Sequence, residues 1–179
     1  VKSGYNFSSP DDKMELGKHL KEISGMAYIP KRNLLLAEND EKGDIFTVDF
    51  ANKNDLVGKE KFGGKGDYED IVYTDTAIYM LVSSGIVVRV STKDSSFATN
   101  EYELGLSGTN EFEAMYLDGD GKSLILLCKD CSKEKNEIRK AYRFDLATQK
   151  FAAELVYTIA ISKIQEILND DKAEFKPSA

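Results

Sequence analysis

Three similar segments decide the fold of this chain: Ser24-Gly-Met-Ala-Tyr28, Glu69-Asp-Ile-Val-Tyr73 and Glu113-Ala-Met-Tyr-Leu117. Their first residues lie 45 and 44 residues apart. The first segment is short and its residues are mostly small or apolar, which suits an innermost strand packed around a crowded axis. A period in the forties is typical of architectures in which one structural unit recurs along the chain.

Each segment is followed by the patterns of further strands. The first is a continuous apolar run, suited to a strand buried on both faces, at residues 34–38, 77–82 and 123–128. The second lies at residues 44–50, 86–90 and 141–146, and it alternates between two unlike faces in the first repeat. In that repeat a polar stretch at 52–61 fits an exposed outer strand whose edge is protected by charged residues.

About four short strands in each period predict a β-propeller, in which every repeat forms one antiparallel blade. We therefore predict an all-β fold with three four-stranded blades, formed by residues near 22–62, 67–105 and 111–157. A chain of 179 residues is expected to form a single domain over residues 1–179.

The period breaks after the third repeat. Ile161, Ile164, Ile167 and Leu168 form a helical stripe within an insertion at 159–170. Ser162 followed by Gln165 fits a capping box, so we predict one short helix near residues 163–169. The final residues, 177–179, align with Ile23-Ser-Gly25 and are interpreted as the beginning of a further blade. Because propellers close into rings, we expect this incomplete ring to be closed by remaining blades of the same protein or by another chain.

Composition and charge exclude some partners. Asp and Glu outnumber Lys and Arg by 31 to 24, for a net charge of −7. This balance argues against nucleic acid as a partner, which requires clustered basic residues. The one basic cluster, at 129–140, is interrupted by acidic residues and is interpreted as a solvated loop. The sequence has no run of eighteen apolar residues, so we predict no transmembrane segment.

Cys128 and Cys131 are the only cysteines, and with a single histidine they cannot assemble a four-ligand zinc site within the chain. Three interpretations stay open. The pair can be one packed cysteine beside one loop cysteine, a local disulfide, or a redox pair, although redox motifs of this spacing usually begin a helix.

Enzyme motifs are weak in this sequence. It has no G-x-S-x-G elbow and no glycine-rich phosphate loop. The only histidine, His19, precedes the first repeat and is interpreted as a surface or packing residue. Asp118-Gly-Asp-Gly121 is similar to part of a calcium loop, but Lys129 stands where that loop needs a bidentate glutamate. We therefore predict a hairpin turn there.

Several segments resemble the SdiA-regulated, YjiK-like propeller family over residues 5–179. They are Glu22-Ile-Ser-Gly-Met-Ala-Tyr28, Asn39-Asp-Glu-Lys-Gly-Asp-Ile-Phe46, Gly66-Asp-Tyr-Glu-Asp-Ile71, Asn110-Glu-Phe-Glu-Ala-Met115 and Leu126-Leu-Cys-Lys-Asp130. The resemblance implies a ring of about six blades and a bacterial protein that is periplasmic, or exported and anchored to the outer membrane as a lipoprotein. The physiological role of the family is largely unassigned. The family tends to have Glu-Gly at the blade opening, where this chain has Glu69-Asp70 and Glu113-Ala114.

The repeats place carboxylates at equivalent positions. Glu69 and Glu113 are in register, and Glu22 lies two residues earlier in the first repeat. We predict that Glu69 and Glu113, with Glu22 as a third ligand, bind Ca²⁺ or Mg²⁺ in the axial channel, since hard oxygen ligands select such ions. The alternative is structural: the glutamates accept hydrogen bonds from backbone N–H groups of the neighbouring blade and hold the blades in register.

Two function classes follow. The favoured one is a non-catalytic bacterial propeller that binds a cation, a small ligand or a protein partner at its axial channel. The other is a metal-dependent propeller hydrolase of the lactonase, esterase or phytase-like kind, in which metal-bound water does the chemistry.

Overall fold

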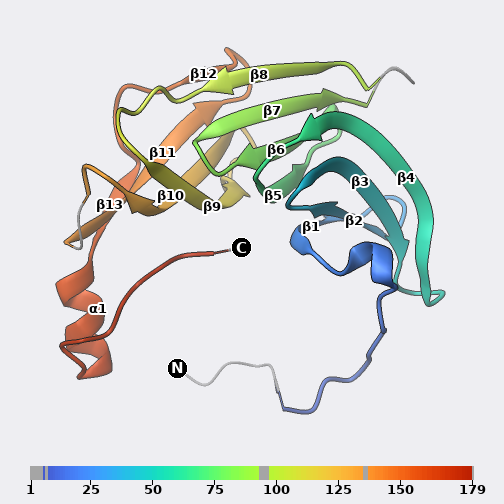
Figure 1. Cartoon of the computed structure of the whole chain (residues 1–179), viewed down its shortest axis with the longest axis horizontal. Helices are drawn as coiled ribbons and strands as arrows, with labels where there is room; N and C mark the ends of the chain where they lie inside the picture. The colour runs from blue at the N-terminus through green and yellow to red at the C-terminus, as the bar shows by residue number, and fades with distance from the viewer. Residues whose placement is uncertain (1–5, 7, 93–96, 135–136, 179) are drawn as a thin grey trace.

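The computed structural model describes residues 6, 8–92, 97–134 and 137–178. Three antiparallel sheets lie side by side in an arc (Figure 1). Blade 1 consists of β1 (Ile23–Ile29), β2 (Leu34–Asn39), β3 (Lys42–Asp49) and β4 (Asn54–Lys65). Blade 2 consists of β5 (Tyr68–Tyr73), β6 (Ala77–Val82), β7 (Ile86–Ser91) and β8 (Thr99–Glu103). Blade 3 consists of β9 (Asn110–Leu117), β10 (Ser123–Cys131), β11 (Ile138–Asp145) and β12 (Lys150–Phe151), with β13 (Tyr157–Ala160) also paired to β11.

In every blade the strands are ordered as they occur in the chain, and the first strands, β1, β5 and β9, line the concave side of the arc (Figure 1). The predicted fold class is therefore confirmed, as are three four-stranded blades. The three sheets are not closed into a ring.

The outer strand of blade 3 is divided into two short strands, β12 and β13. β12 pairs with one end of β11 and β13 with the other end. Between them, Ala152 N–H donates to the Arg143 carbonyl and Val156 N–H to the Ala141 carbonyl. The three residues Ala153 to Leu155 have no place in this ladder, so the chain loops outward and divides the strand.

The predicted helix is present as α1 (Ile161–Leu168), but its predicted capping box is wrong. The N-cap residue is Ala160, and no side chain caps the helix. The chain passes from β13 into α1 without a loop, and the first helical N–H, that of Ile161, donates to the Glu137 carbonyl at 2.9 Å. Ser162 therefore lies inside the helix. The helix ends at Asn169, which has a left-handed backbone with φ of 52°.

A short 3₁₀ helix, η1 (Lys18–Leu20), precedes blade 1, and an irregular segment follows α1. That segment runs into the concave side of the arc (Figure 1), and Arg139 of β11 donates from Nε to the Phe175 carbonyl at 3.2 Å. Pro177 and Ser178 form no strand. The proposed further blade at 177–179 stays a prediction, since Ala179 lies outside the described residues. Among the described residues, no helix is long and apolar enough to cross a membrane.

The core lies between the blades, because neighbouring side chains of each middle strand point in opposite directions. In β6, Ile78 and Met80 pack against blade 1, whereas Tyr79 and Leu81 pack against blade 3. This arrangement explains the continuous apolar runs in the sequence. Blade 1 buries a further cluster on its other face around Phe46.

Backbone hydrogen bonds join the blades at equivalent points. The N–H of Tyr68, at the start of β5, donates to the Asp40 carbonyl of blade 1 at 2.8 Å. The N–H of Phe112, near the start of β9, donates to the Ser83 carbonyl of blade 2, also at 2.8 Å. Both acceptors lie in the turn after the second strand of a blade. Each blade therefore positions the first strand of the next.

The first strands approach closely where Gly25 of β1 faces Asp70 of β5. A Cβ atom at Gly25 would lie 2.8 Å from the Asp70 Cα and 2.9 Å from the Ile71 nitrogen. Real Cβ atoms do not approach backbone this closely, so any side chain here would push blades 1 and 2 apart.

We expect Gly25→Ala to lower the free energy of unfolding by about 1–3 kcal/mol, the usual cost of overpacking. The matched control is Gly119→Ala, in the β9–β10 turn, where a Cβ would meet no atom within 4 Å. Urea unfolding of both variants measures the effect. Equal stability of the two variants would show that the close approach at Gly25 does not limit the packing of the blades.

Candidate functional site

Asp70 is the carboxylate that joins two blades at the concave side. Its Oδ1 accepts the N–H of Ile71 at 2.8 Å, and its Oδ2 accepts the N–H of Met115 in β9 at 2.6 Å. Burial raises the pKa of Asp70 to about 6, against the lowering effect of these two N–H groups. The structural alternative for Glu69 and Glu113 was to accept a backbone N–H of the neighbouring blade. Asp70, the residue after Glu69, has this role.

Glu69, the first predicted cation ligand, lies on β5 and is half-buried. Its Oε2 accepts a long hydrogen bond from Ser24 Oγ at 3.4 Å. Burial, together with the nearby carboxylates of Glu113 and Asp67, raises the pKa of Glu69 to about 7. The structure therefore brings Glu69 and Glu113 close enough for their charges to interact, as expected from their register.

Glu113 and Glu22 are placed differently from one another. Glu113, on β9, forms an ion pair with Lys129 of β10, and this pairing raises the pKa of Lys129. Glu22 is exposed one residue before β1, and its backbone carbonyl accepts Asn39 Nδ2 and the Asp40 N–H, each at 3.2 Å. Through its backbone carbonyl, Glu22 therefore connects the start of β1 to the end of β2. Its predicted role as a third ligand stays a prediction.

A cavity of about 510 Å³, which we call the axial cavity, lies beside β1, β5 and β9. It is lined by Ile23, Ser24, Gly25, Met26, Asp70, Ala114, Met115 and Tyr116. Two apolar side chains at its rim are largely exposed: Met26 at 58% and Tyr116 at 42%. The axial cavity is thus lined by exposed Met26 and Tyr116 and by the buried Asp70.

A second group of carboxylates lies between blades 1 and 2, and we call it the Glu38 cluster: Glu38, Asp40, Glu69 and Asp70. Glu38 is 0% exposed. Burial, together with the charges of Asp70, Glu69 and Asp40, raises its pKa to about 8, against the lowering effect of the nearby Gly25 N–H. That N–H does not reach ordinary hydrogen-bond geometry, and within the described part of the chain neither oxygen of Glu38 has a hydrogen-bond partner. Sequence analysis missed Glu38 because it stands within an apolar run.

Cys128 and Cys131 form a disulfide, which excludes the interpretation as one packed and one loop cysteine, both free. Glu134 lies beside them, and this is the only trio of His, Cys, Asp or Glu in the described residues whose ligand atoms lie within 4.8 Å of one another. The sulfurs are bonded to each other, and Glu134 accepts the Lys140 N–H and the Tyr142 hydroxyl at 3.1 and 3.2 Å. The trio is therefore a structural element at the end of β10.

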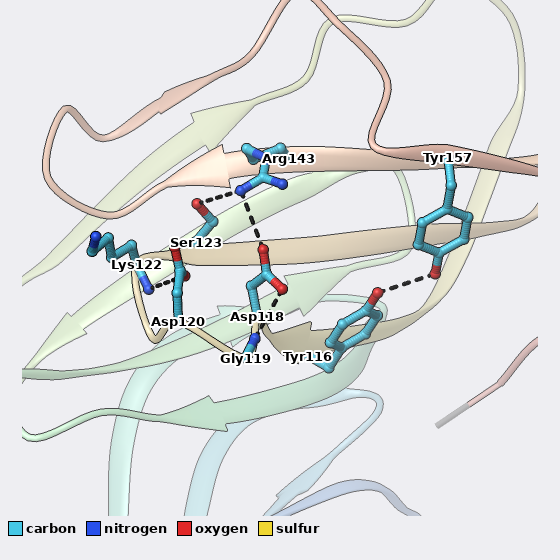
Figure 2. A network of polar contacts seen from close by, with 8 residues as sticks. All are labelled: Tyr116, Asp118, Gly119, Asp120, Lys122, Ser123, Arg143 and Tyr157. Atoms are coloured by element: carbon cyan, nitrogen blue, oxygen red, sulfur yellow. Dashed lines mark hydrogen bonds and ion pairs between the residues drawn. The ribbon is translucent and has the colours of Figure 1, made fainter.

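The turn at 118–122 is the hairpin that the sequence predicted. Figure 2 shows that its carboxylates make local contacts: Asp118 accepts from the Gly119 N–H and from Arg143, and Asp120 accepts from the Lys122 N–H. In the same view the hydroxyls of Tyr116 and Tyr157 are hydrogen-bonded at 3.1 Å, which joins β9 to β13. This network holds Tyr116 at the rim of the axial cavity.

Four-stranded sheets arranged around a shared concave side define the chain as a β-propeller protein. No protein-family model and no curated protein matches the sequence. Among solved structures, the chain is similar to hydrazine synthase from Kuenenia stuttgartiensis, with a TM-score of 0.55 and 17% identity over 77% of this chain. It spans only 37% of the length of that protein.

A second similar structure is the β-propeller domain of Cps50 (Swd1) from Myceliophteria thermophila. The TM-score is 0.48 and the identity 9%, over 77% of this chain and 42% of that one. At such identities the similarity to solved structures concerns the fold alone.

Replacing Asp70 by Asn should lower the free energy of unfolding by about 1–3 kcal/mol, because one of its two acceptor oxygens becomes a donor that faces a buried N–H. Asp67→Asn, on an exposed side chain three residues away, is the control and should change stability by less than about 0.5 kcal/mol. Chemical denaturation measures both. A harmless Asp70→Asn would mean that the contact with Met115 does not hold blades 2 and 3 together.

The buried carboxylates also predict how stability depends on pH. The pKa values of Glu38, Glu69 and Asp70 are higher in the folded protein than in the unfolded chain. The folded state therefore binds more protons, and the free energy of unfolding falls as the pH rises from about 4 to about 8. In EDTA at pH 8, Glu38→Gln should be more stable than the wild type by about 3 kcal/mol, because the amide stays neutral.

Urea titrations at pH 5 and pH 8 check this expectation, with the wild type as the reference. The difference between the two proteins should be small at pH 5, where Glu38 is already protonated. A wild type whose stability rises over this range would contradict the assignment of Glu38 as a neutral buried acid.

Proposed function

We propose that this protein is a non-catalytic β-propeller that binds a cation at the axial side of β1, β5 and β9, through Glu69 and Glu113. The observation that carries the proposal is the charge balance there. Lys129 forms an ion pair with Glu113 and offsets the charge of Glu69 only weakly. Among the described residues Glu69 accepts the long hydrogen bond from Ser24, and burial, followed by its acidic neighbours, raises its pKa to about 7. A bound cation would relieve this repulsion.

The apolar rim extends the range of ligands. Met26 and Tyr116 lie at the rim of the axial cavity, beside the strands that carry the two glutamates. A small ligand with a cationic group and an apolar part fits this combination, since tyrosine rings attract cations as well as apolar groups. Among metal ions, carboxylate oxygens favour Ca²⁺ and Mg²⁺. No feature of the described residues specifically favours the hydrolase alternative.

A periplasmic or membrane-anchored location is a further part of the proposal. The disulfide between Cys128 and Cys131 supports it, because structural disulfides persist in oxidising compartments. The resemblance to SdiA-regulated propellers points the same way. Closure of the ring by further blades or another chain is likewise proposed.

Calorimetric titration with Ca²⁺ tests the cation site. We expect Glu69→Gln to weaken binding at least about tenfold, since it removes the uncompensated charge. Lys129→Gln should strengthen binding, because it releases Glu113 from its ion pair. The matched control is Lys31→Gln, which breaks the ion pair of Lys31 with Asp75. Both side chains of that pair are well exposed, Lys31 at 72% and Asp75 at 65%.

Equal Ca²⁺ affinity in Lys129→Gln, Lys31→Gln and wild-type protein would contradict the participation of Glu113. Undiminished affinity in Glu69→Gln would overturn the proposed site.

A further inference from the structure

Glu38 is an unusual residue for the interior of a sheet. It lies in the middle strand β2, it is 0% exposed, and among the described residues both of its carboxylate oxygens are without a hydrogen-bond partner. Buried polar atoms are nearly always paired, because an unpaired one forfeits its bonds to water. A buried carboxylate with two such oxygens is therefore missing a partner.

Asp40 shares this feature. It follows Glu38 by two residues, in the turn after β2, and its charge acts on Glu38, so the two carboxylates lie near one another. Its Oδ1 is also buried and has no partner in the part of the chain that the structure describes. Three buried acceptor oxygens from two neighbouring carboxylates are thus left without donors.

The backbone directs these groups toward blade 2. The Asp40 carbonyl accepts the Tyr68 N–H at 2.8 Å, which fixes the end of β2 against the start of β5. The next two residues of β5 are Glu69 and Asp70, and both act electrostatically on Glu38. All three side chains whose charges act on Glu38, those of Asp70, Glu69 and Asp40, are acidic.

We propose that Glu38 and Asp40 form a buried Ca²⁺ site between blades 1 and 2, with Asp70 and Glu69 of β5 beside it. The site differs from the axial one because Glu38 and Asp40 would supply its ligands, whereas Glu69 and Glu113 would supply those of the axial site. A cation supplies the missing partner for all three orphaned oxygens at once. It also links the second strand of one blade to the first strand of the next.

The donor set favours Ca²⁺. All the side chains are carboxylates, which suit hard cations, and Ca²⁺ accepts six to eight oxygens in flexible geometry, whereas Mg²⁺ demands a regular octahedron. Oxygens on opposite sides of a Ca²⁺ ion are about 5 Å apart, given Ca–O distances of about 2.3–2.6 Å. No trio of these carboxylates lies within 4.8 Å in the described residues, so small side-chain rotations must complete the site. Buried water is the competing partner, and it predicts no response to metal.

Direct measurement of bound Ca²⁺ tests the proposal, by equilibrium dialysis of the folded chain after removal of metal with EDTA. We expect Glu38→Gln to lose one equivalent of Ca²⁺, or to bind it at least about tenfold more weakly. Asp40→Asn should weaken the same site. Glu113→Gln is the control: it alters the axial site but should retain the equivalent that Glu38→Gln loses.

Thermal unfolding with and without Ca²⁺ provides the second readout. The wild type and Glu113→Gln should melt at higher temperature with Ca²⁺ than in EDTA, and Glu38→Gln should lose that part of the shift while it stays folded in EDTA. Unchanged Ca²⁺ binding in both Glu38→Gln and Asp40→Asn overturns the proposal. So does loss of the same single equivalent in Glu38→Gln and Glu113→Gln, which would place all the carboxylates in one axial site. If Glu38→Gln loses Ca²⁺ and Glu113→Gln binds as much Ca²⁺ as the wild type, the buried site stands and the axial proposal fails.

Discussion

One recurring backbone hydrogen bond sets how the blades are assembled. The first strand of blade 2 donates through Tyr68 to the turn carbonyl of Asp40, and that of blade 3 donates through Phe112 to the equivalent carbonyl of Ser83. The turn residues are themselves held, since the N–H groups of Asp40 and Ser83 donate to the carbonyls of Glu22 and Asp67, just before their own first strands. Each turn therefore connects two blades at a fixed point.

This fixed point explains why the backbones of blades 1 and 2 come so close at Gly25. With the first strands anchored to the preceding turns, the backbones of β1 and β5 meet where Gly25 faces Asp70, and no Cβ fits between them. The middle strands are then held at a distance that their large apolar side chains fill from both sides. Because such interiors are close-packed, the geometry tolerates little adjustment.

The same constraint concentrates negative charge. Residues at the start of β5 and the end of β2 are brought together by the Tyr68–Asp40 hydrogen bond, so the charges of their carboxylates act on one another. Asp70 is compensated by two N–H groups and Glu113 by Lys129. Glu38 and Glu69 have no comparable compensation among the described residues, and burial raises the pKa of each. This imbalance is what both proposed cation sites would correct.

The sequence by itself determined the blades. Their period, the apolar runs of β6 and β10 and the glycine turns are local patterns, and local patterns are visible in one dimension. It also placed Glu69 and Glu113 in register, because equivalent repeat positions become neighbours in space.

The sequence could not tell the role of Glu69 from that of Asp70. The bulge between Tyr68 and Asp70 decides which of these adjacent carboxylates points into the neighbouring blade. The capping box failed for a similar reason: the Glu137 carbonyl, distant in sequence, receives the first helical N–H. Only the tertiary structure decided the fate of Glu38, because its isolation from donors is a property of the packed interface between two blades and not of β2 alone.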